Sequence, residues 1–159
     1  MASRSDNWSV VVVGPVGSGK TSLIQRLAYG TVLGSDPTLA PMCYRLETVT
    51  YWDTPGDDKF SWASEPLLKR ADLVLYCLAP DGDSELRNYE ALTAAPVLAV
   101  HTKADTTTTR TERDTSAVTG EGIDALTAEI AAVLGQGTRC PAPAGVNLAA
   151  EAPAKAGCC

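Results

Sequence analysis

The sequence predicts an α/β fold with a mostly parallel sheet of five or six strands and helices on both faces. Three observations predict it. Short apolar runs, rich in valine and leucine, mark candidate buried strands at 8–13, 73–78 and 96–100. Segments with apolar residues at helical spacing alternate with these runs, most clearly 20–29 and 121–134. The length of 159 residues allows one domain with a sizeable core.

The other elements are expected between these segments. Residues 30–42 are rich in Gly, Pro and Thr and are predicted to form a loop. The stretch 43–53 predicts two short strands or one bent strand. Residues 60–70 predict a helix disturbed by Pro66, and 83–92 a short helix with Leu and Tyr on one face.

Composition divides the chain into two parts. Residues 1–134 carry the periodic pattern of a folded domain, whereas 135–159 are dominated by Pro, Ala and Gly and are expected to form a flexible tail. The net charge of −6 argues against a nucleic-acid partner. No apolar run approaches the roughly 20 residues that span a bilayer, and the first residues lack a secretory signal. Five cysteines in a chain of this length favour a reducing, cytosolic setting.

A glycine-rich stretch, GPVGSGKTS, follows the first valine-rich strand at 14–22. It fits the pattern G-x-x-x-x-G-K-[ST], whose backbone N–H groups bind phosphate oxygens at a helix N-terminus. The lysine is expected to reach the β- and γ-phosphates, and the threonine to hold Mg²⁺. A glycine-rich turn without a ligand is the alternative, and the motif does not distinguish a kinase from a hydrolase. The candidate nucleotide-binding residues are Gly14, Val16, Gly17, Ser18, Gly19, Lys20, Thr21 and Ser22.

Two further segments carry candidate ligands for Mg²⁺ and the γ-phosphate. Asp53 ends a predicted strand and is placed to hold a water on Mg²⁺. Gly56 lacks a side chain, so its N–H can approach a γ-phosphate closely. Thr38, in the loop before that strand, can supply a second hydroxyl to Mg²⁺ when the γ-phosphate is present. The predicted metal ligands are therefore Thr21, Thr38 and Asp53.

A base-binding segment is predicted after the strand at 96–100. Asp105 can accept two hydrogen bonds from guanine N1–H and N2–H₂, which adenine does not offer. The stem of Lys103 can cover the face of the base, and Thr102 precedes it. Ser116 and Ala117 can add a backbone N–H to the guanine oxygen. A solvated Lys/Asp turn without a ligand is the alternative.

Together these residues resemble a small GTPase of the Ras superfamily, with the Rab family as the nearest match. Residues 52–60, WDTPGDDKF, resemble the Rab stretch W-D-T-A-G-Q-E-R-F, and 67–71, LLKRA, resemble Y-Y-R-G-A. Residues 115–121, TSAVTGE, resemble T-S-A-K-T-G-E. The resemblance covers about 8–134. It implies a P-loop NTPase G domain, GTP or GDP with Mg²⁺, and a monomeric switch in vesicle traffic that binds effectors, an exchange factor and prenylation chaperones.

Departures from the Rab pattern predict slow hydrolysis. The resemblance assigns catalytic roles to Lys20, Thr38 and Asp57, but Asp57 stands where the family has the glutamine that orients the attacking water. Its charged form cannot donate a hydrogen bond. Val16 occupies a loop position that is usually small, where it would crowd that water or an arginine finger. Only 10 residues separate Asp105 from Ser116, so the helix that the family places there is predicted to be missing or vestigial.

Two cysteines in the tail, Cys158 and Cys159, resemble the doubly prenylated Rab signal. Two lipid chains give stable membrane anchoring, whereas one gives marginal binding. The resemblance therefore implies a cytoplasmic protein held on the cytosolic face of an endomembrane. A pair of unmodified thiols is the alternative.

Two other functions compete with a slow GTPase switch. One is a membrane-tethered binding module that stays loaded with GTP and does not turn over, which Asp57 and Val16 favour. The other is a P-loop kinase, which needs an acceptor site and a basic lid, and no Arg-rich lid segment is present in the sequence.

Overall fold

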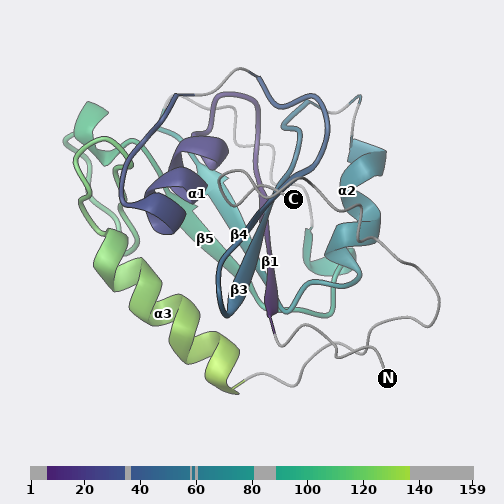
Figure 1. The fold of residues 1–159 in the computed structure, drawn as a ribbon. Coiled ribbons are helices and arrows are strands. Elements are labelled where there is room, and N and C mark those ends of the chain that lie inside the picture. Colours follow the sequence, from purple (N-terminus) through teal and green to yellow (C-terminus); the bar gives the residue numbers. More distant parts are fainter. Residues whose placement is uncertain (1–6, 35–36, 58, 60, 81–88, 137–159) are drawn as a thin grey trace.

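A computed structural model describes residues 7–34, 37–57, 59, 61–80 and 89–136, in which helices cover both faces of a five-stranded sheet (Figure 1). The strand order is β2-β3-β1-β4-β5. The strands are β1 (Trp8–Val13), β2 (Met42–Arg45), β3 (Val49–Asp53), β4 (Leu73–Leu78) and β5 (Val97–His101). All neighbours pair in parallel except β2 and β3, which form an antiparallel hairpin. The mostly parallel α/β fold predicted from the sequence is confirmed.

Strand β1 lies at the centre of the sheet and is buried on both faces. Val10 to Val13 are at most 1 % exposed, as expected for a strand covered on both faces. The strand pairs with β3 through Val12 and Asp53 and with β4 through Val13 and Tyr76. Because β1, β3, β4 and β5 run in the same direction, their carboxyl ends meet at one edge of the sheet.

The helices divide between the two faces of the sheet. On one face, α1 (Lys20–Tyr29) and α3 (Ile123–Gln136) pack Leu23, Ile24 and the apolar stripe of α3 against the sheet (Figure 1). On the other face, α2 (Ser61–Leu68) contributes Leu67 and Leu68. Pro66 lies inside α2, within the helix predicted at 60–70.

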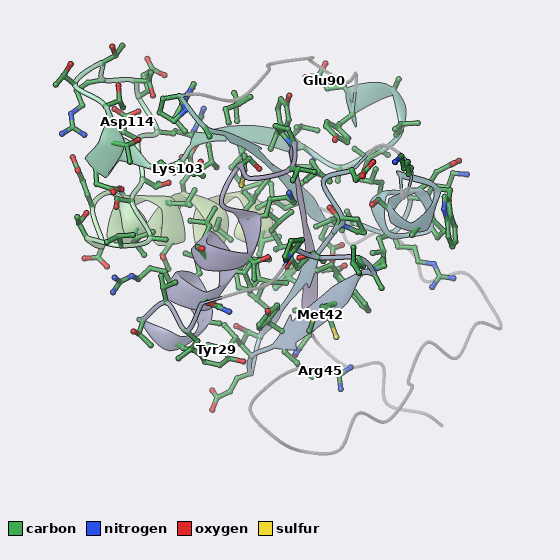
Figure 2. The ribbon with its side chains drawn as sticks, turned by 90° about the horizontal axis from the view of Figure 1, so that it is seen from above. Tyr29, Met42, Arg45, Glu90, Lys103 and Asp114 are labelled. Atoms are coloured by element: carbon green, nitrogen blue, oxygen red, sulfur yellow. The ribbon has the colours of Figure 1, made fainter. Side chains whose placement is uncertain are left out.

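The segment after β5 is a short loop without an α-helix. A single 3₁₀ turn, η3 (Ala104–Thr106), follows the strand, and no α-helix forms between residues 107 and 115, all of which the structure describes. The chain then makes one parallel bridge between His101 and Asp114, a rudiment of a further strand. The prediction of a missing helix is thus confirmed. Figure 2 shows Asp114 and Lys103 near one side of the molecule, and Met42 and Arg45 of β2 near the other.

Two predicted features lie partly or wholly outside the described residues. Of the helix expected at 83–92, only 89–92 are described, and η2 (Tyr89–Ala91) is one 3₁₀ turn. The cysteines of the predicted tail also fall outside the described residues. Within the described part, no helix combines the length and apolar character needed to cross a bilayer.

Candidate functional site

The glycine-rich loop connects β1 to α1 at the carboxyl edge of the sheet. Gly14 has φ 149°, and a Cβ atom there would lie 2.5 Å from the Cys77 carbonyl oxygen, so only glycine lets the loop leave β1 beside β4. Gly19 adopts a left-handed conformation at the N-terminus of α1 and accepts from the Leu23 N–H at 2.9 Å. The helix N-terminus and the loop therefore face the same space, as a phosphate-binding loop requires.

The lysine of the loop is held close to the backbone. Lys20 is 6 % exposed, and its Nζ donates to the Pro15 carbonyl oxygen at 2.9 Å. Burial lowers the pKa of Lys20 below its ordinary value of 10.5, and electrostatic interactions with Cys77 and Asp53 oppose that shift less strongly. A negatively charged phosphate beside the Lys20 ammonium would favour its charged form and offset the free-energy cost of its burial.

Three oxygen-bearing side chains meet next to this lysine. The Thr21 hydroxyl donates to Asp53 Oδ2 at 2.5 Å, the Thr38 hydroxyl donates to the same oxygen at 3.2 Å, and the two hydroxyl oxygens lie 3.2 Å apart. Asp53 is fully buried, and its other oxygen, Oδ1, has no hydrogen-bond partner. Burial raises the pKa of Asp53, while the hydrogen bond from Thr21 and the charge of Lys20 lower it less strongly.

This donor set fits Mg²⁺. The ion is usually bound in nucleotide sites by one carboxylate and a few hydroxyls, with water and phosphate oxygens completing the shell. Asp53 leaves one carboxylate oxygen unsatisfied beside the hydroxyls of Thr21 and Thr38. Thr21, Thr38 and Asp53 would hold the ion, which would neutralise negative charge on a bound phosphate group. No cluster of three or more His, Cys, Asp or Glu side chains suited to a metal occurs among the described residues.

Gly56 lies directly against the glycine-rich loop. A Cβ atom on Gly56 would lie 2.6 Å from the Val16 amide nitrogen and 2.7 Å from Lys20 Nζ. Only a glycine therefore allows the segment after β3 to approach the loop this closely. The neighbouring Asp57 accepts from the Lys59 N–H through Oδ1 at 2.9 Å. The Val16 side chain is 65 % exposed.

These segments enclose a cleft of about 400 Å³. This volume falls in the usual range for small-molecule sites. The cleft receives residues from the glycine-rich loop, the loop before β2, the end of β3 and the turn after β5, which are far apart in the sequence. Its lining residues are Val16, Gly17, Gly19, Lys20, Thr21, Ser22, Pro37, Thr38, Leu39, Gly56, Asp57 and Lys103.

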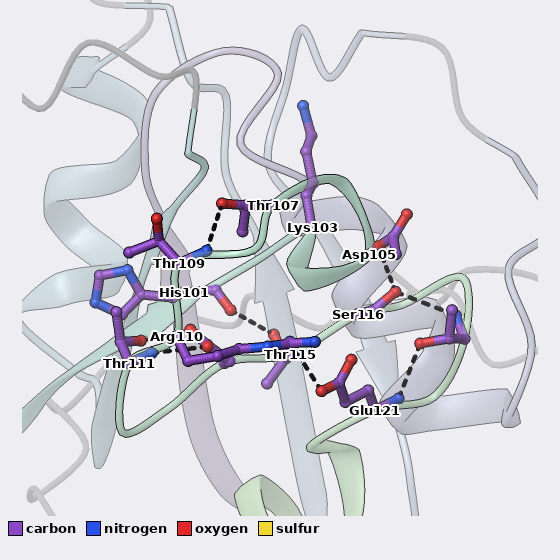
Figure 3. Close-up of polar contacts among 12 residues, drawn as sticks. His101, Lys103, Asp105, Thr107, Thr109, Arg110, Thr111, Thr115, Ser116 and Glu121 are labelled. Atoms are coloured by element: carbon purple, nitrogen blue, oxygen red, sulfur yellow. Dashed lines mark hydrogen bonds and ion pairs between the residues drawn. The ribbon is translucent and has the colours of Figure 1, made fainter.

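The predicted base-binding residues form a connected group beside the cleft. The Ser116 hydroxyl donates to Asp105 Oδ1 at 2.5 Å and accepts from the Thr119 N–H at 3.1 Å (Figure 3). Lys103, with φ 57°, extends from the same turn as Asp105 (Figure 3). Ala117 follows Ser116 in this loop. The structure therefore places Lys103, Asp105, Ser116 and Ala117 together.

Thr102 links the base-binding turn to the glycine-rich loop. Its hydroxyl donates to the Ser18 carbonyl oxygen at 2.6 Å. Ser18 is 1 % exposed, and its own hydroxyl has no hydrogen-bond partner. Ser18, like Gly14, lies below the cleft surface and shapes the loop, in contrast to the cleft-lining residues.

Sequence reasoning missed residues that line the cleft and a residue that holds a loop beside it. Pro37 and Leu39 line the cleft beside Thr38. Arg26 contacts the loop that carries Ala117. Arg26 stands at an exposed-face position of an amphipathic helix, so the sequence offers no signal that separates it from a solvated arginine.

Comparison with solved structures relates the chain to GTP-binding domains. It aligns with Roco2 RocCORdC of Methanosarcina barkeri, solved bound to GDP, at 19 % identity and a TM-score of 0.68, over 84 % of this chain and 50 % of that one. It aligns with the bacterial selenocysteine-specific elongation factor EF-Sec at 20 % identity and a TM-score of 0.67, over 82 % of this chain and 29 % of that one. No protein-family model matches the chain, and no curated protein sequence matches it.

These similarities establish the fold. The chain has the P-loop GTPase fold, as the glycine-rich loop and the sheet order indicate. It spans half of one neighbour and less than a third of the other, so the activities of those larger proteins do not transfer with the fold.

Proposed function

We propose that the protein is a Rab-like guanine-nucleotide switch that binds GTP or GDP with Mg²⁺ and hydrolyses GTP slowly. One observation carries this proposal: the glycine-rich loop, Thr38, Gly56 and Lys103 line a single cleft, with Asp53 buried beneath it. A nucleotide needs this combination of phosphate, metal and base contacts in one place.

In this proposal the phosphates lie over the glycine-rich loop. The N–H groups of the loop and Lys20 would bind the β- and γ-phosphates, and Thr21 and Asp53 would hold Mg²⁺ directly or through water. Thr38 already contacts both of these residues. Its loop would be ordered when a γ-phosphate is present and released when it is absent, which is the basis of a switch.

Guanine is favoured over adenine by the group around Asp105. The carboxylate is oriented by the Ser116 hydroxyl, which leaves Asp105 further acceptor capacity for N1–H and N2–H₂ of guanine. Adenine would leave that carboxylate without donors, and such a mismatch can discriminate by roughly 10⁴-fold. The GDP bound to the Roco2 neighbour is consistent with this choice.

Titration with fluorescent GDP, GTP and ATP tests the proposal. Nucleotide-free protein with Mg²⁺ should bind both guanine nucleotides and bind ATP far more weakly. Asp105→Asn should lose most of the affinity for GDP, whereas Asp124→Asn, a matched change on the exposed side of α3, should retain it. Equal affinity for ATP and GTP would reject guanine specificity, and no binding of either would reject the nucleotide site.

A module that stays loaded with GTP is the second candidate function. Two observations favour it. Val16 on the loop is 65 % exposed, and Asp57 accepts a hydrogen bond from the Lys59 N–H. Both residues line the cleft where the attacking water would have to be oriented. Nucleotide extracted from the purified protein separates the two candidates. Mostly GTP supports the module, and mostly GDP supports the switch.

The membrane-traffic part of the proposal rests on Cys158 and Cys159 and on the resemblance of 52–60 to Rab proteins. Prenylation of both cysteines would anchor the protein on the cytosolic face of an endomembrane. Mass spectrometry of the protein from eukaryotic cells should detect two isoprenoid groups. Replacing both cysteines with serine should move the protein from the membrane fraction to the soluble fraction, and an unmodified wild-type tail would reject the anchor.

A further inference from the structure

The side chain of Arg26, on α1, contacts the backbone of two loops. Its Nε donates to the Ala117 carbonyl oxygen at 2.5 Å, and its Nη2 donates to the Val118 carbonyl oxygen at 2.6 Å. Its Nη1 donates to the Gly30 carbonyl oxygen at 2.5 Å. One guanidinium therefore joins the loop beside Asp105 to the end of α1, across 91 residues of sequence.

The geometry of this contact restricts the loop strongly. A guanidinium is planar and presents its donors in a rigid fork, so two consecutive carbonyl groups bound to it must keep a set orientation. The other side of the loop is also held, because the Ser116 N–H donates to the Glu121 carbonyl oxygen at 2.9 Å and the Ser116 hydroxyl donates to Asp105. Ala117 lies between these two sets of contacts.

The same turn of α1 also holds the start of the loop that leads to Thr38. Gly30 donates its N–H to the Arg26 carbonyl oxygen at 2.9 Å while it accepts from the Arg26 side chain. The neighbouring Gln25 accepts from the Leu33 N–H at 2.9 Å and donates to the Gly34 carbonyl oxygen at 3.2 Å. The last turn of α1 is therefore a shared anchor for both loops.

We propose that Arg26 is a positioning residue for guanine recognition, which holds the Ala117 N–H in place to donate to the oxygen at position 6 of the base. This proposal rests on the proposed function, because it needs a guanine nucleotide in the cleft. Arg26 touches the loop and not the base. Its effect comes from preorganisation: a loop that is already ordered loses less entropy when the base binds, so the base leaves more slowly.

Three nucleotides test the assignment, because two of them each remove or weaken one contact. GDP presents all the groups of guanine. IDP lacks the amino group at position 2, so it loses a contact with Asp105. The 6-thio analogue of GDP replaces the oxygen at position 6 with a weak acceptor, so it weakens the contact with the Ala117 N–H. Arg26→Met keeps the aliphatic stem but removes every donor, Arg26→Lys keeps the charge but loses the fork, and Arg45→Ala removes an exposed arginine on β2 as the matched control.

We expect Arg26→Met to lower the preference for GDP over the 6-thio analogue by about threefold to tenfold, the range of one hydrogen bond. The preference for GDP over IDP should change little, and the GDP dissociation rate should rise more than the association rate changes. Arg26→Lys should fall between Arg26→Met and wild type, and Arg45→Ala should match wild type. A merely structural role would weaken all three nucleotides equally, and that result would overturn the assignment.

A second measurement needs no nucleotide. Amide hydrogen exchange of nucleotide-free Arg26→Met should be faster at 117–120 and at 30–34 than in wild type, with little change in β1. Unchanged exchange in both loops would overturn the positioning role even if nucleotide affinity fell. A wild-type protein that binds no guanine nucleotide would instead overturn the proposed function, which separates the two failures.

Discussion

The Thr102 hydroxyl donates to the Ser18 carbonyl oxygen at 2.6 Å, across 84 residues of sequence, and thereby ties the base-binding turn to the glycine-rich loop. Thr102 is 5 % exposed, and its hydroxyl also approaches the Leu78 carbonyl oxygen at 3.2 Å. One buried hydroxyl therefore joins the two halves of the candidate site directly.

Removing this hydroxyl should weaken both folding and nucleotide binding. Thr102→Val keeps the shape of the side chain but leaves the buried Ser18 carbonyl without this donor, which costs about 1–3 kcal/mol. We expect the free energy of unfolding, measured by urea denaturation, to fall by that amount, and GDP affinity to fall with it. Thr102→Ser retains the hydroxyl and should stay close to wild type. Equal stability of Thr102→Val and wild type would contradict the link.

A second prediction concerns Asp53 and pH. Burial raises the pKa of Asp53 above its ordinary value of 3.8, so Asp53 keeps its proton to higher pH in the folded, nucleotide-free protein than in the unfolded chain. Stability from this group is present below that value and is lost as pH rises through the raised pKa. Asp53→Asn does not ionise. Its free energy of unfolding relative to wild type should therefore increase as pH rises from about 4 to about 7.

With Mg²⁺ and GDP bound, wild type should become more stable than Asp53→Asn. Asp53 is the carboxylate of the proposed metal site, so Mg²⁺ with GDP should raise the melting temperature of wild type and raise that of Asp53→Asn much less. Thermal denaturation with and without both ligands measures this. A stability difference that does not depend on pH, or equal stabilisation of both proteins by the ligands, would contradict the prediction.

The elements that sequence reasoning located correctly are those with a local pattern. Strand β1 is β-branched and buried on both faces, so its sequence alone distinguishes it. The final helix was predicted to begin at Glu121 but begins at Ile123. Glu121 accepts from the Ser116 N–H through its carbonyl oxygen, so it belongs to the base-binding loop. Tertiary contacts thus decide the boundary, and periodicity cannot detect them.

The same distinction applies to the candidate site. The glycine-rich loop and the cluster of Thr21, Thr38 and Asp53 follow from short motifs at strand ends, and the structure brings them together. The contacts of Thr102 with Ser18 and of Arg26 with Ala117 join segments more than 80 residues apart. No local pattern reports such pairs, because each depends on how the strands are ordered in the sheet.

A third prediction concerns the close approach of Gly56 to the glycine-rich loop. In Gly56→Ala, the added Cβ would lie 2.6 Å from the Val16 amide nitrogen, so the segment after β3 must move away from the loop. Its N–H would then no longer reach a γ-phosphate. We expect the preference for GTP over GDP to fall by about tenfold, the value of one hydrogen bond to a charged group. Gly135→Ala, where a Cβ meets nothing within 4 Å, is the control. Loss of GTP and GDP affinity in equal measure would contradict it.

The fourth prediction concerns hydrolysis. Val16 and Asp57 both line the cleft. In the proposed GTPase, a carboxylate at position 57 would not donate the hydrogen bond that orients the attacking water, and Val16 would crowd that water. Asp57→Gln combined with Val16→Gly should accelerate single-turnover GTP hydrolysis by about tenfold to 100-fold. Asp57→Asn removes the charge but keeps the short side chain, so it separates the effects of charge and reach. An unchanged rate in the double variant would show that these two residues do not limit hydrolysis.

The fifth prediction uses the ion pair that holds the shortened segment after β5 on α3. Arg113 binds Glu129 through Nε at 2.9 Å and through Nη2 at 2.7 Å. The hydrogen bond from Arg113 lowers the pKa of Glu129 below its ordinary value of 4.5, so its stabilising effect is present above that value and is lost as pH falls through the lowered pKa. Glu129→Gln should cost about 0.5–1 kcal/mol at neutral pH, because the pair is partly exposed, and nothing in strong acid. Urea denaturation across this pH range measures the difference.

Glu65→Gln, which breaks the more exposed pair with Lys69 on α2, is the control for this prediction and should have a smaller effect. A Glu129→Gln cost no greater than that of Glu65→Gln would mean that the segment is held by its bridge to His101 instead.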